Sequence, residues 1–499
     1  MASANSRPFI AAATAVFACA ATAALAFCGN GLEPRWPLMW IAPLPVLAFA
    51  LRSRALPAAA IAFIAWFTGY MNLSHYLRLV GVPPAAWLSG VAIAALVFAL
   101  AILLFRGLIL RGRPILAIFA FPAAEVAYEY LRNLSWPHGT SLSLAYSQLH
   151  FLPFLQTASL FGPWGMTFLL LLFPATIATA WQLRSAAPRR ATRVAVAGLL
   201  PVAAALLFGA IRLALPGPSH AVQVALITSD AGSNDIPAAA EAPAQRLLSA
   251  YAGQASRLAD AGARAIVIPE KVAYLTPETA PAADALFQPI ADRSGATLVL
   301  GVDFEAPSVA WNQSRVYRPH QPVLTYAKHH LLPPFEDKFR PGTWRITWPA
   351  STGTWGTAIC KDMDFTPLSR HYGEDGAGLM LVPAWDFNID RAFHGHIAIM
   401  RAVEDGFSLV RSAKNGYATV TDNRGRILAE RRSDAAPWVT ISAIVPAAHS
   451  PTLFLLIGDA FAWFAMALLV LAVILSFRSS AEASRAGYVV SPDRSHALQ

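Results

Sequence analysis

The sequence predicts an α-helical, multi-pass membrane domain joined to a layered α/β domain. Three observations support this prediction. The 499 residues are 56% hydrophobic and only 13% charged, whereas soluble domains average about 25% charged residues. Apolar runs of membrane-spanning length fill residues 1–215 and return near the C-terminus. Between them, β-like runs alternate with helix-like stretches, which is typical of a layered α/β domain.

Eight apolar segments have the length of a membrane-spanning helix, about 20 residues, or come close to it. Seven precede the polar region and one follows it: residues 9–27, 37–51, 55–73, 85–105, 114–130, 161–181, 195–215 and 453–477. The first segment resembles a signal peptide, but Phe27 is too large for the position before a cleavage site at Cys28. We therefore expect this segment to stay in the protein.

Loop arginines predict the orientation, because they concentrate on the cytoplasmic side of a membrane. With seven spans before the polar region, one side carries Arg7, Arg52, Arg54, Arg106, Arg111, Arg113, Arg184, Arg189, Arg190, Arg193, Arg478 and Arg485. The other side carries mainly Arg35, Arg78, Arg132 and Arg212. Both termini are therefore expected in the cytoplasm, and the polar region in the periplasm, at the bacterial inner membrane. The net charge of +9 arises from these scattered arginines, which argues against nucleic-acid binding.

Three domains are predicted: a membrane domain at 1–215, an extracytoplasmic α/β domain at 216–450, and a final span with a cytoplasmic tail at 451–499. Within the α/β domain, period-two and apolar patterns predict strands at 221–227, 265–268, 297–301, 314–317, 323–326, 356–359, 379–382, 408–411 and 418–421. Helical patterns cover 242–261, 282–293 and 394–404.

Cys360 is the only cysteine outside the hydrophobic N-terminal region, and it stands between a β-like run and the charged pair Lys361-Asp362. A lone thiol is most often an inert buried side chain. Here, however, Glu270 and Lys328 also follow β-like runs. Since strands commonly deliver such residues to one edge, the ordered trio favours a nucleophilic thiol.

A thiol with an ordinary pKa of about 8.5 is mostly protonated at neutral pH, so it needs a base, a cation or both. Glu270 can serve as the base and Lys328 as the cation, which can also stabilise an oxyanion. Glu336 follows Lys328 by eight residues, and a rigid proline pair could turn it back toward the site. A buried structural salt bridge is the alternative for Glu336.

Other ionisable residues have less specific patterns. His394 and His396 do not share a helix face and have no apparent third ligand, so neither a metal nor a cofactor is expected. Glu125 and Glu129 lie in or near a predicted span, where a carboxylate is a functional candidate by default. All five lysines, namely Lys271, Lys328, Lys338, Lys361 and Lys414, fall in the polar region of an arginine-rich chain.

These residues resemble the nitrilase, or carbon–nitrogen hydrolase, superfamily over about 222–444. The resemblance rests on Pro269-Glu270, Lys328 within Tyr326-Ala327-Lys328-His329-His330-Leu331, Phe335-Glu336 and Ile359-Cys360. With seven apolar segments before this region and one after it, the whole chain resembles the apolipoprotein N-acyltransferases. The segments 400–404 and 411–416 match as well. The resemblance implies an α-β-β-α sandwich and a Glu270, Lys328, Cys360 triad supported by Glu336.

The resemblance also implies a ping-pong reaction. The Cys360 thiolate would take an acyl chain from a phospholipid as a thioester, and the N-terminal amine of a diacylglyceryl-cysteine apolipoprotein would then accept it. Glu270 would act as base in both halves.

Lys361-Asp362 stands where an aromatic residue and Glu are usual, and 383–387 replaces a Ser-Asn-Asp-x-Trp run. The glycine expected before Glu336 is also missing. These departures leave open a membrane-tethered amidase, or a paralogous N-acyltransferase with a different amine or lipid acceptor. Lys361 could lower the thiol pKa, or it could be exposed.

Overall fold

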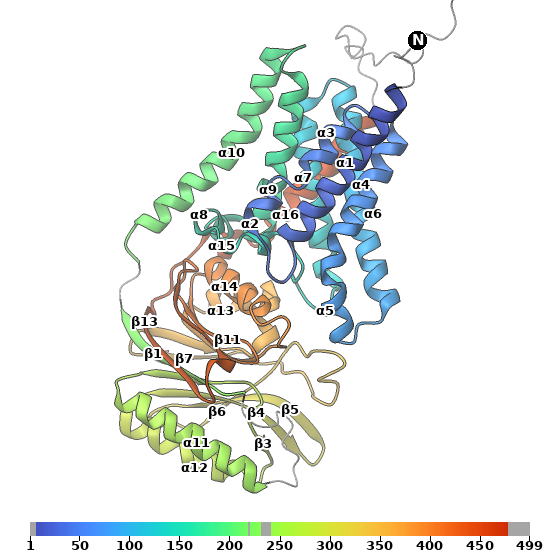
Figure 1. Cartoon of the computed structure of the whole chain (residues 1–499). Helices are drawn as coiled ribbons and strands as arrows, with labels where there is room; N and C mark the ends of the chain where they lie inside the picture. The colour runs from blue at the N-terminus through green and yellow to red at the C-terminus, as the bar shows by residue number, and fades with distance from the viewer. Residues whose placement is uncertain (1–5, 218–219, 231–240, 478–499) are drawn as a thin grey trace, which may run out of the picture.

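A bundle of apolar helices packs against one side of an α/β domain (Figure 1). The computed structural model describes residues 6–217, 220–230 and 241–477. Seven helices within the described residues have the length and composition to cross a membrane. The long bundle helices are α1 (Ser6–Gly29), α4 (Ala55–Gly69), which continues to Leu79 as one apolar span, α6 (Pro84–Leu110), α7 (Pro114–Ser135), α9 (Ala158–Leu183), α10 (Pro188–Ala214) and α16 (Ala460–Phe477). Shorter helices and 3₁₀ turns connect them: η1 (Tyr70–Leu73), α5 (Ser74–Leu79), η2 (Leu144–Gln148), α8 (Leu152–Leu155) and α15 (Leu453–Ile457).

The predicted continuous span at 37–51 is wrong. This segment folds as two short helices, α2 (Trp36–Met39) and α3 (Leu44–Ala50), separated by a turn. The cause is proline, since Pro43 and Pro45 cannot donate the backbone hydrogen bonds that would continue α2 into α3. Six long apolar helices of the described chain therefore precede the α/β domain instead of seven. The predicted last span is also broken, between α15 and α16 at Gly458.

The broken segment still runs from one end of the bundle to the other. At one end, Arg106 Nε donates to the carbonyl oxygens of Ala50 and Ser53, at 3.1 and 3.0 Å. At the other end, Trp40 Nε1 donates to Gln148 Oε1 at 2.7 Å. The alternation of chain direction assumed by the orientation prediction is thus retained. Arg478 and Arg485 lie outside the described residues.

A seven-stranded sheet and a six-stranded sheet form the centre of the α/β domain. The first has the order β13-β1-β2-β4-β5-β6, with β3 paired to β4. Its strands are β1 (Ala221–Thr228), β2 (Ala265–Ile268), β3 (Tyr274–Leu275), β4 (Thr297–Ala306), β5 (Val309–Tyr317), β6 (Leu324–Ala327) and β13 (Val439–Pro446). The second has the order β12-β11-β10-β9-β8-β7. Its strands are β7 (Ile346–Ala350), β8 (Gly353–Thr357), β9 (Ala377–Trp385), β10 (Ser408–Lys414), β11 (Tyr417–Thr421) and β12 (Ile427–Arg432).

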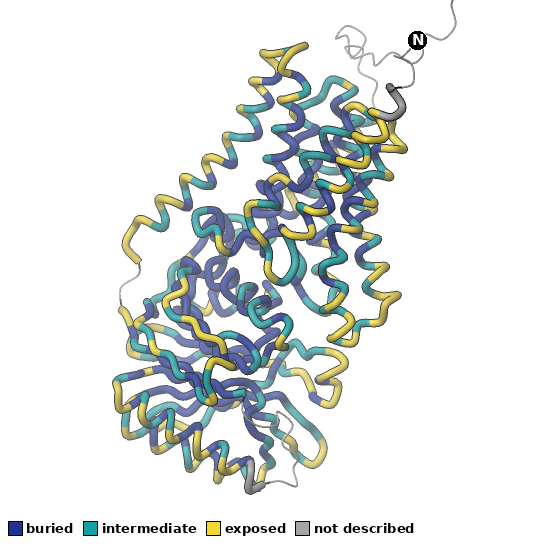
Figure 2. The backbone as a smooth tube through the Cα atoms, viewed as in Figure 1, coloured by how far each residue is buried: buried dark blue, intermediate teal, exposed yellow. Residues whose placement is uncertain are grey.

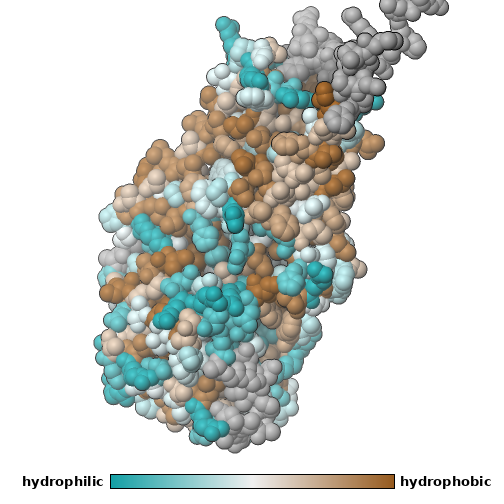
Figure 3. Space-filling view, in the orientation of Figure 1, coloured by the Kyte–Doolittle hydropathy of each residue, from teal (hydrophilic) through white to brown (hydrophobic). Residues whose placement is uncertain are grey.

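Helices cover the outer face of each sheet. Alternating residues of β1 show the layering, because Val224 joins the core between the sheets while Ala225 joins the core under α11 (Glu241–Asp260) and α12 (Ala280–Ser294). The second sheet is covered by α13 (Thr366–Glu374) and α14 (Phe393–Asp405), whose apolar residues belong to one core with the bundle helices. The two sheets form the buried centre of the α/β domain in Figure 2. Hydrophobic residues cover much of the surface of the bundle in Figure 3. The predicted fold class, a membrane bundle plus an α-β-β-α sandwich, is confirmed.

The sequence patterns missed β3, β7, β12, β13 and α13. Two of these are edge strands whose sequences lack an apolar alternation: β12 is largely charged and exposed, and β7 contains Pro349. Edge strands tolerate both features because one side of the strand has no partner. The strand predicted at 356–359 ends at Thr357, and the chain then enters the 3₁₀ turn η3 (Cys360–Asp364).

Candidate active site

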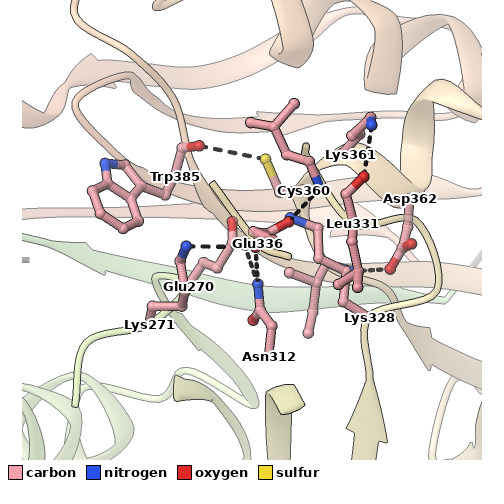
Figure 4. Close-up of polar contacts among 12 residues, drawn as sticks. Glu270, Lys271, Asn312, Lys328, Leu331, Glu336, Cys360, Lys361, Asp362 and Trp385 are labelled. Atoms are coloured by element: carbon pink, nitrogen blue, oxygen red, sulfur yellow. Dashed lines mark hydrogen bonds and ion pairs between the residues drawn. The ribbon is translucent and has the colours of Figure 1, made fainter. Parts of the chain in front are cut away.

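The ends of three strands deliver the predicted site residues. Glu270 follows β2, Lys328 follows β6, and Cys360 begins η3 just beyond β8. Glu336 comes from the loop after β6. The structure brings these four residues together between the two sheets, as Figure 4 shows.

Lys328 is held between two carboxylates. Its Nζ lies 2.9 Å from Glu270 Oε1 and 2.9 Å from Glu336 Oε2. Asn312 of β5 bridges the same pair, since its Nδ2 donates to Glu270 Oε1 at 2.5 Å and to Glu336 Oε1 at 2.6 Å. The three ionisable side chains are only 2–3% exposed. Rotation of any one of them would therefore leave a buried charge unpaired.

The electrostatics of the cluster favour the ionised forms of Lys328 and Glu336. Burial acts to lower the pKa of Lys328, but Glu270 and Glu336 together outweigh it and raise that pKa well above its usual value. Burial likewise acts to raise the pKa of Glu336, yet Lys328 and then Lys271 hold it at about 2. The cluster thus supplies a fixed ammonium and a carboxylate at neutral pH.

Cys360 occupies a strained and buried position beside this cluster. Its φ is +43°, a conformation that non-glycine residues adopt mostly where the surroundings enforce it. The thiol donates to the Trp385 carbonyl oxygen at 3.5 Å, and Arg411 Nη2 lies 3.9 Å from the sulfur. Burial, then the Glu270 charge, raises the pKa of Cys360, while Lys328 and Arg411 oppose this rise. The thiol is therefore protonated at rest and needs a base to become a nucleophile.

The chain is similar to known proteins over most of its length. The family described as "Apolipoprotein N-acyltransferase N-terminal domain" matches residues 18–176. The apolipoprotein N-acyltransferase of Geobacter metallireducens is 26% identical, over 91% of this chain and 93% of its own. That of Bradyrhizobium diazoefficiens is 28% identical, over 89% and 91%. The resemblance to the apolipoprotein N-acyltransferases is confirmed. Together with the seven long apolar helices, it supports a multi-pass bacterial membrane enzyme that acts as an N-acyltransferase.

Solved structures that include members of the nitrilase superfamily are similar to just under half of this chain. An amidase from Nesterenkonia sp. is 23% identical with a TM-score of 0.39, covering 47% of this chain and 93% of the amidase. Nit3 of Saccharomyces cerevisiae is 20% identical with a TM-score of 0.39, covering 46% of this chain and 92% of Nit3.

Lys361 and Asp362, which directly follow Cys360 and differ from the pattern of the resembled family, are both buried. Asp362 binds the turn to the Lys328 segment, because its carboxylate accepts from the backbone N–H groups of Ile359, His329 and His330 at 2.8–3.1 Å. Lys361 is 2% exposed, so the exposed alternative is wrong. Its Nζ donates to the Leu331 carbonyl oxygen at 2.8 Å, and burial lowers its pKa to about 8.

Sequence reasoning missed several residues that contact the site. Asn312 carried no signal, because an asparagine inside a strand is unremarkable until its partners are known. Arg411 and Asp386 form a fully buried pair at 2.5 and 2.8 Å, and the sequence placed them only within the segments 411–416 and 383–387, with no role for either. Trp385 has the Nζ atoms of Lys271 and Lys414 at 4.5 and 4.2 Å from its ring centre. The confinement of lysines to the polar region was the one signal for this arrangement.

Of the other ionisable candidates, Glu129 and the two histidines have structural partners, whereas Glu125 is buried and its Oε2 accepts no hydrogen bond from the described residues. Glu129 accepts hydrogen bonds from Ser143 Oγ, Thr167 Oγ1 and the Leu144 N–H at 2.7–2.9 Å. His394 contacts two aspartates, and His396 packs on the ring of His150. No cluster of three metal-ligating side chains occurs among the described residues.

Proposed function

We propose that the protein transfers a fatty acyl chain from a phospholipid, through a thioester on Cys360, to the N-terminal amine of a diacylglyceryl-cysteine apolipoprotein. The observation that carries this proposal is the Glu270, Lys328 and Glu336 cluster beside a buried thiol in a domain packed on an apolar bundle. The full-length similarity to apolipoprotein N-acyltransferases supports it.

In the first half-reaction Glu270 takes the proton of the Cys360 thiol. The thiolate attacks the ester carbonyl carbon of the phospholipid, and Lys328 stabilises the charge that develops on the carbonyl oxygen. The C–O ester bond breaks, a C–S bond replaces it, and Glu270 returns its proton to the departing lysophospholipid. Arg411, 3.9 Å from the sulfur, stabilises the thiolate.

In the second half-reaction the acceptor amine attacks the thioester carbon. Glu270 removes a proton from the amine, the C–S bond breaks, and an amide forms. The proton on Glu270 then restores the thiol. Glu336 and Asn312 keep Lys328 and Glu270 in place through both halves.

The same proposal assigns the domains and the compartment. Residues 216–450 form the catalytic domain, 1–215 the membrane domain, and 451–499 the last span and tail. Arginine-bearing loops lie at the bundle end opposite the α/β domain (Figure 1). By the positive-inside rule this arrangement supports a catalytic domain in the periplasm, at the inner membrane. Both substrates then stay in the bilayer, which matters because extracting lipid costs ~0.8 kcal/mol per CH₂ group.

A second candidate is a membrane-tethered amidase or an N-acyltransferase with another amine or lipid acceptor. The approach of the Lys271 and Lys414 ammonium groups to the Trp385 ring favours it, because Trp385 belongs to the segment 383–387 that departs from the pattern of the resembled family.

Intact-mass spectrometry of the purified full-length protein tests both candidates. The protein is first freed of bound acyl groups with neutral hydroxylamine, then given phospholipid with or without a diacylated lipopeptide. We expect one acyl adduct on Cys360 that persists until the lipopeptide removes it. Rapid loss of the adduct as free fatty acid would support the amidase. The absence of any adduct, or full turnover by Cys360→Ala, would contradict the proposal.

A further inference from the structure

The 3₁₀ turn that begins at Cys360 ends against a loop of the membrane domain. The backbone N–H and the hydroxyl of Thr140 both donate to the Asp364 carbonyl oxygen, at 3.0 and 2.9 Å. Thr140 belongs to the loop 136–143 between α7 and η2. Two residues that are 224 positions apart in the sequence thus join the bundle to the last residue of η3, the turn that begins at Cys360.

The loop is shaped for this approach. Gly139 has a φ of +53°, and a Cβ placed there would lie 2.3 Å from the Asp364 carbonyl oxygen. Only glycine allows both the backbone conformation and the short distance. The approach of the loop to the turn is therefore a specific feature of the sequence.

The Thr140 hydroxyl is fixed in one orientation. A hydroxyl has a single proton, and Thr140 gives it to Asp364. Tyr146 OH at 2.5 Å and Arg401 Nη1 at 3.3 Å then donate to the remaining lone pairs. Thr140 is 2% exposed, so water does not compete for these bonds.

The side chain of Asp364 is held independently. His394 of α14 places Nδ1 at 3.2 Å from Asp364 Oδ2 and Nε2 at 3.6 Å from Asp390 Oδ2. Burial acts to lower the pKa of His394, but Asp364 and then Asp390 raise it to about 9. Tyr76 of α5 lies close to Asp390, which brings a second element of the bundle next to this histidine.

We propose that Thr140 is a positioning residue of the active site, and that the membrane domain thereby holds the Cys360 thiol in its reactive geometry. Asp362 anchors the start of the five-residue turn through the Ile359 N–H, and Thr140 anchors its end. Released at one end, the strained Cys360 backbone would relax, and the sulfur would move away from Arg411 and Lys328. What the thiol reacts with rests on the proposed function, but its reactivity does not.

Alkylation of Cys360 by iodoacetamide tests this proposal in the full-length protein, in lipid-free detergent after hydroxylamine treatment. Peptide mass spectrometry separates Cys360 from Cys19 and Cys28. Thr140→Val keeps the side-chain shape and removes the hydroxyl, whereas Thr140→Ser keeps the hydroxyl. Thr452→Val is the matched control, because its hydroxyl also donates to a carbonyl oxygen of the α/β domain, that of Glu404, away from the turn.

We expect Thr140→Val to slow alkylation about tenfold at pH 7.5, as small misplacements of reacting groups do. The midpoint of its pH–rate curve should rise, because the sulfur loses its cations. With phospholipid as donor, kcat should fall while KM stays near the wild-type value. Thr140→Ser should restore both readouts, and Thr452→Val should leave them unchanged.

Equal alkylation of Thr140→Val and Thr452→Val would overturn the proposal, as would a Thr140→Ser variant no better than Thr140→Val. If Thr140→Val does not fold, His394→Asn removes the other hold on Asp364 and must slow alkylation in the same direction. Failure of the proposed function looks different, since the wild-type protein would then never be acylated by phospholipid while the alkylation pattern held.

Discussion

Both regions of the molecule bury glutamates, but they give them different partners. In the bundle, Glu129 is 2% exposed and is satisfied by two hydroxyl groups and a backbone N–H. In the α/β domain, Glu270 and Glu336 are equally buried, and both bind the ammonium of Lys328. The difference teaches that burial alone does not mark chemistry. A carboxylate tied to a cation beside a thiol can exchange protons with a substrate, whereas one enclosed by hydroxyls fixes a loop.

Removal of the cation should have the largest effect. Lys328→Met leaves two buried carboxylates without their ammonium and removes the group that stabilises the oxyanion. We expect acyl transfer to fall by about 10³-fold or more, measured as single-turnover transfer to the lipopeptide. Lys338→Met is the control, because Lys338 is exposed. Transfer by Lys328→Met within tenfold of wild type would remove Lys328 from the mechanism.

Substitution of Arg411 should have a smaller effect, and this effect should act only through the reactivity of the Cys360 thiol. Arg411→Lys loses the two-pronged contact with Asp386, which a lysine cannot reproduce. The cation then moves from the sulfur, the Cys360 pKa rises, and alkylation at pH 7.5 should slow about tenfold. Arg315→Lys is the matched control, because Arg315 makes the same kind of contact with Asp284 elsewhere. An unchanged pH–rate midpoint in Arg411→Lys would contradict this role.

His394 makes a pH-dependent contribution to stability. Its pKa is about 9 in the folded protein against an ordinary 6.5. A raised folded pKa means that the contribution is complete below pH 6.5 and disappears as the pH rises through about 9. The full shift corresponds to about 3 kcal/mol. We expect the thermal midpoint in detergent to fall across this window in the wild type. His394→Asn should have a flatter profile, and parallel profiles would refute the assignment.

The smallest effect on turnover is expected at Glu129. Glu129→Gln keeps the shape but weakens hydrogen bonds to a charged acceptor, at a cost of about 1–2 kcal/mol in stability. Transfer per folded molecule should stay within about twofold of wild type. The number of folded molecules is measured by titration of the reactive Cys360 thiol. A loss as large as that of Lys328→Met would show that the bundle carboxylate takes part in the chemistry.

Local sequence patterns were enough to propose three candidate residues that the structure brings together, but they failed for residues whose partners come from distant strands. Glu270, Lys328 and Cys360 were recognisable because each follows a short apolar run. Asn312 and Arg411 were not, because their roles depend on which strands pair and which faces meet. The contact between Thr140 and Asp364 spans 224 positions, and no local pattern encodes it.

The fold shows the same division. Long apolar runs and buried strands were found, whereas the proline-broken segment 37–51 and the charged edge strand β12 were misjudged. The prolines of segment 37–51 are unusual in a segment that crosses a helix bundle, and the charged residues of β12 are unusual in a strand. The bundle tolerates a broken helix, because its neighbours fix the ends. The sheet tolerates a polar edge, because solvent covers the other side.

The most direct test of the account is the rate at which phospholipid acylates Cys360 in Glu270→Gln and in Glu129→Gln, followed by rapid quench and intact mass. We expect a rate at least about 10³-fold below wild type for Glu270→Gln and a wild-type rate for Glu129→Gln. Normal acylation in Glu270→Gln, or an equal loss in both variants, would contradict it.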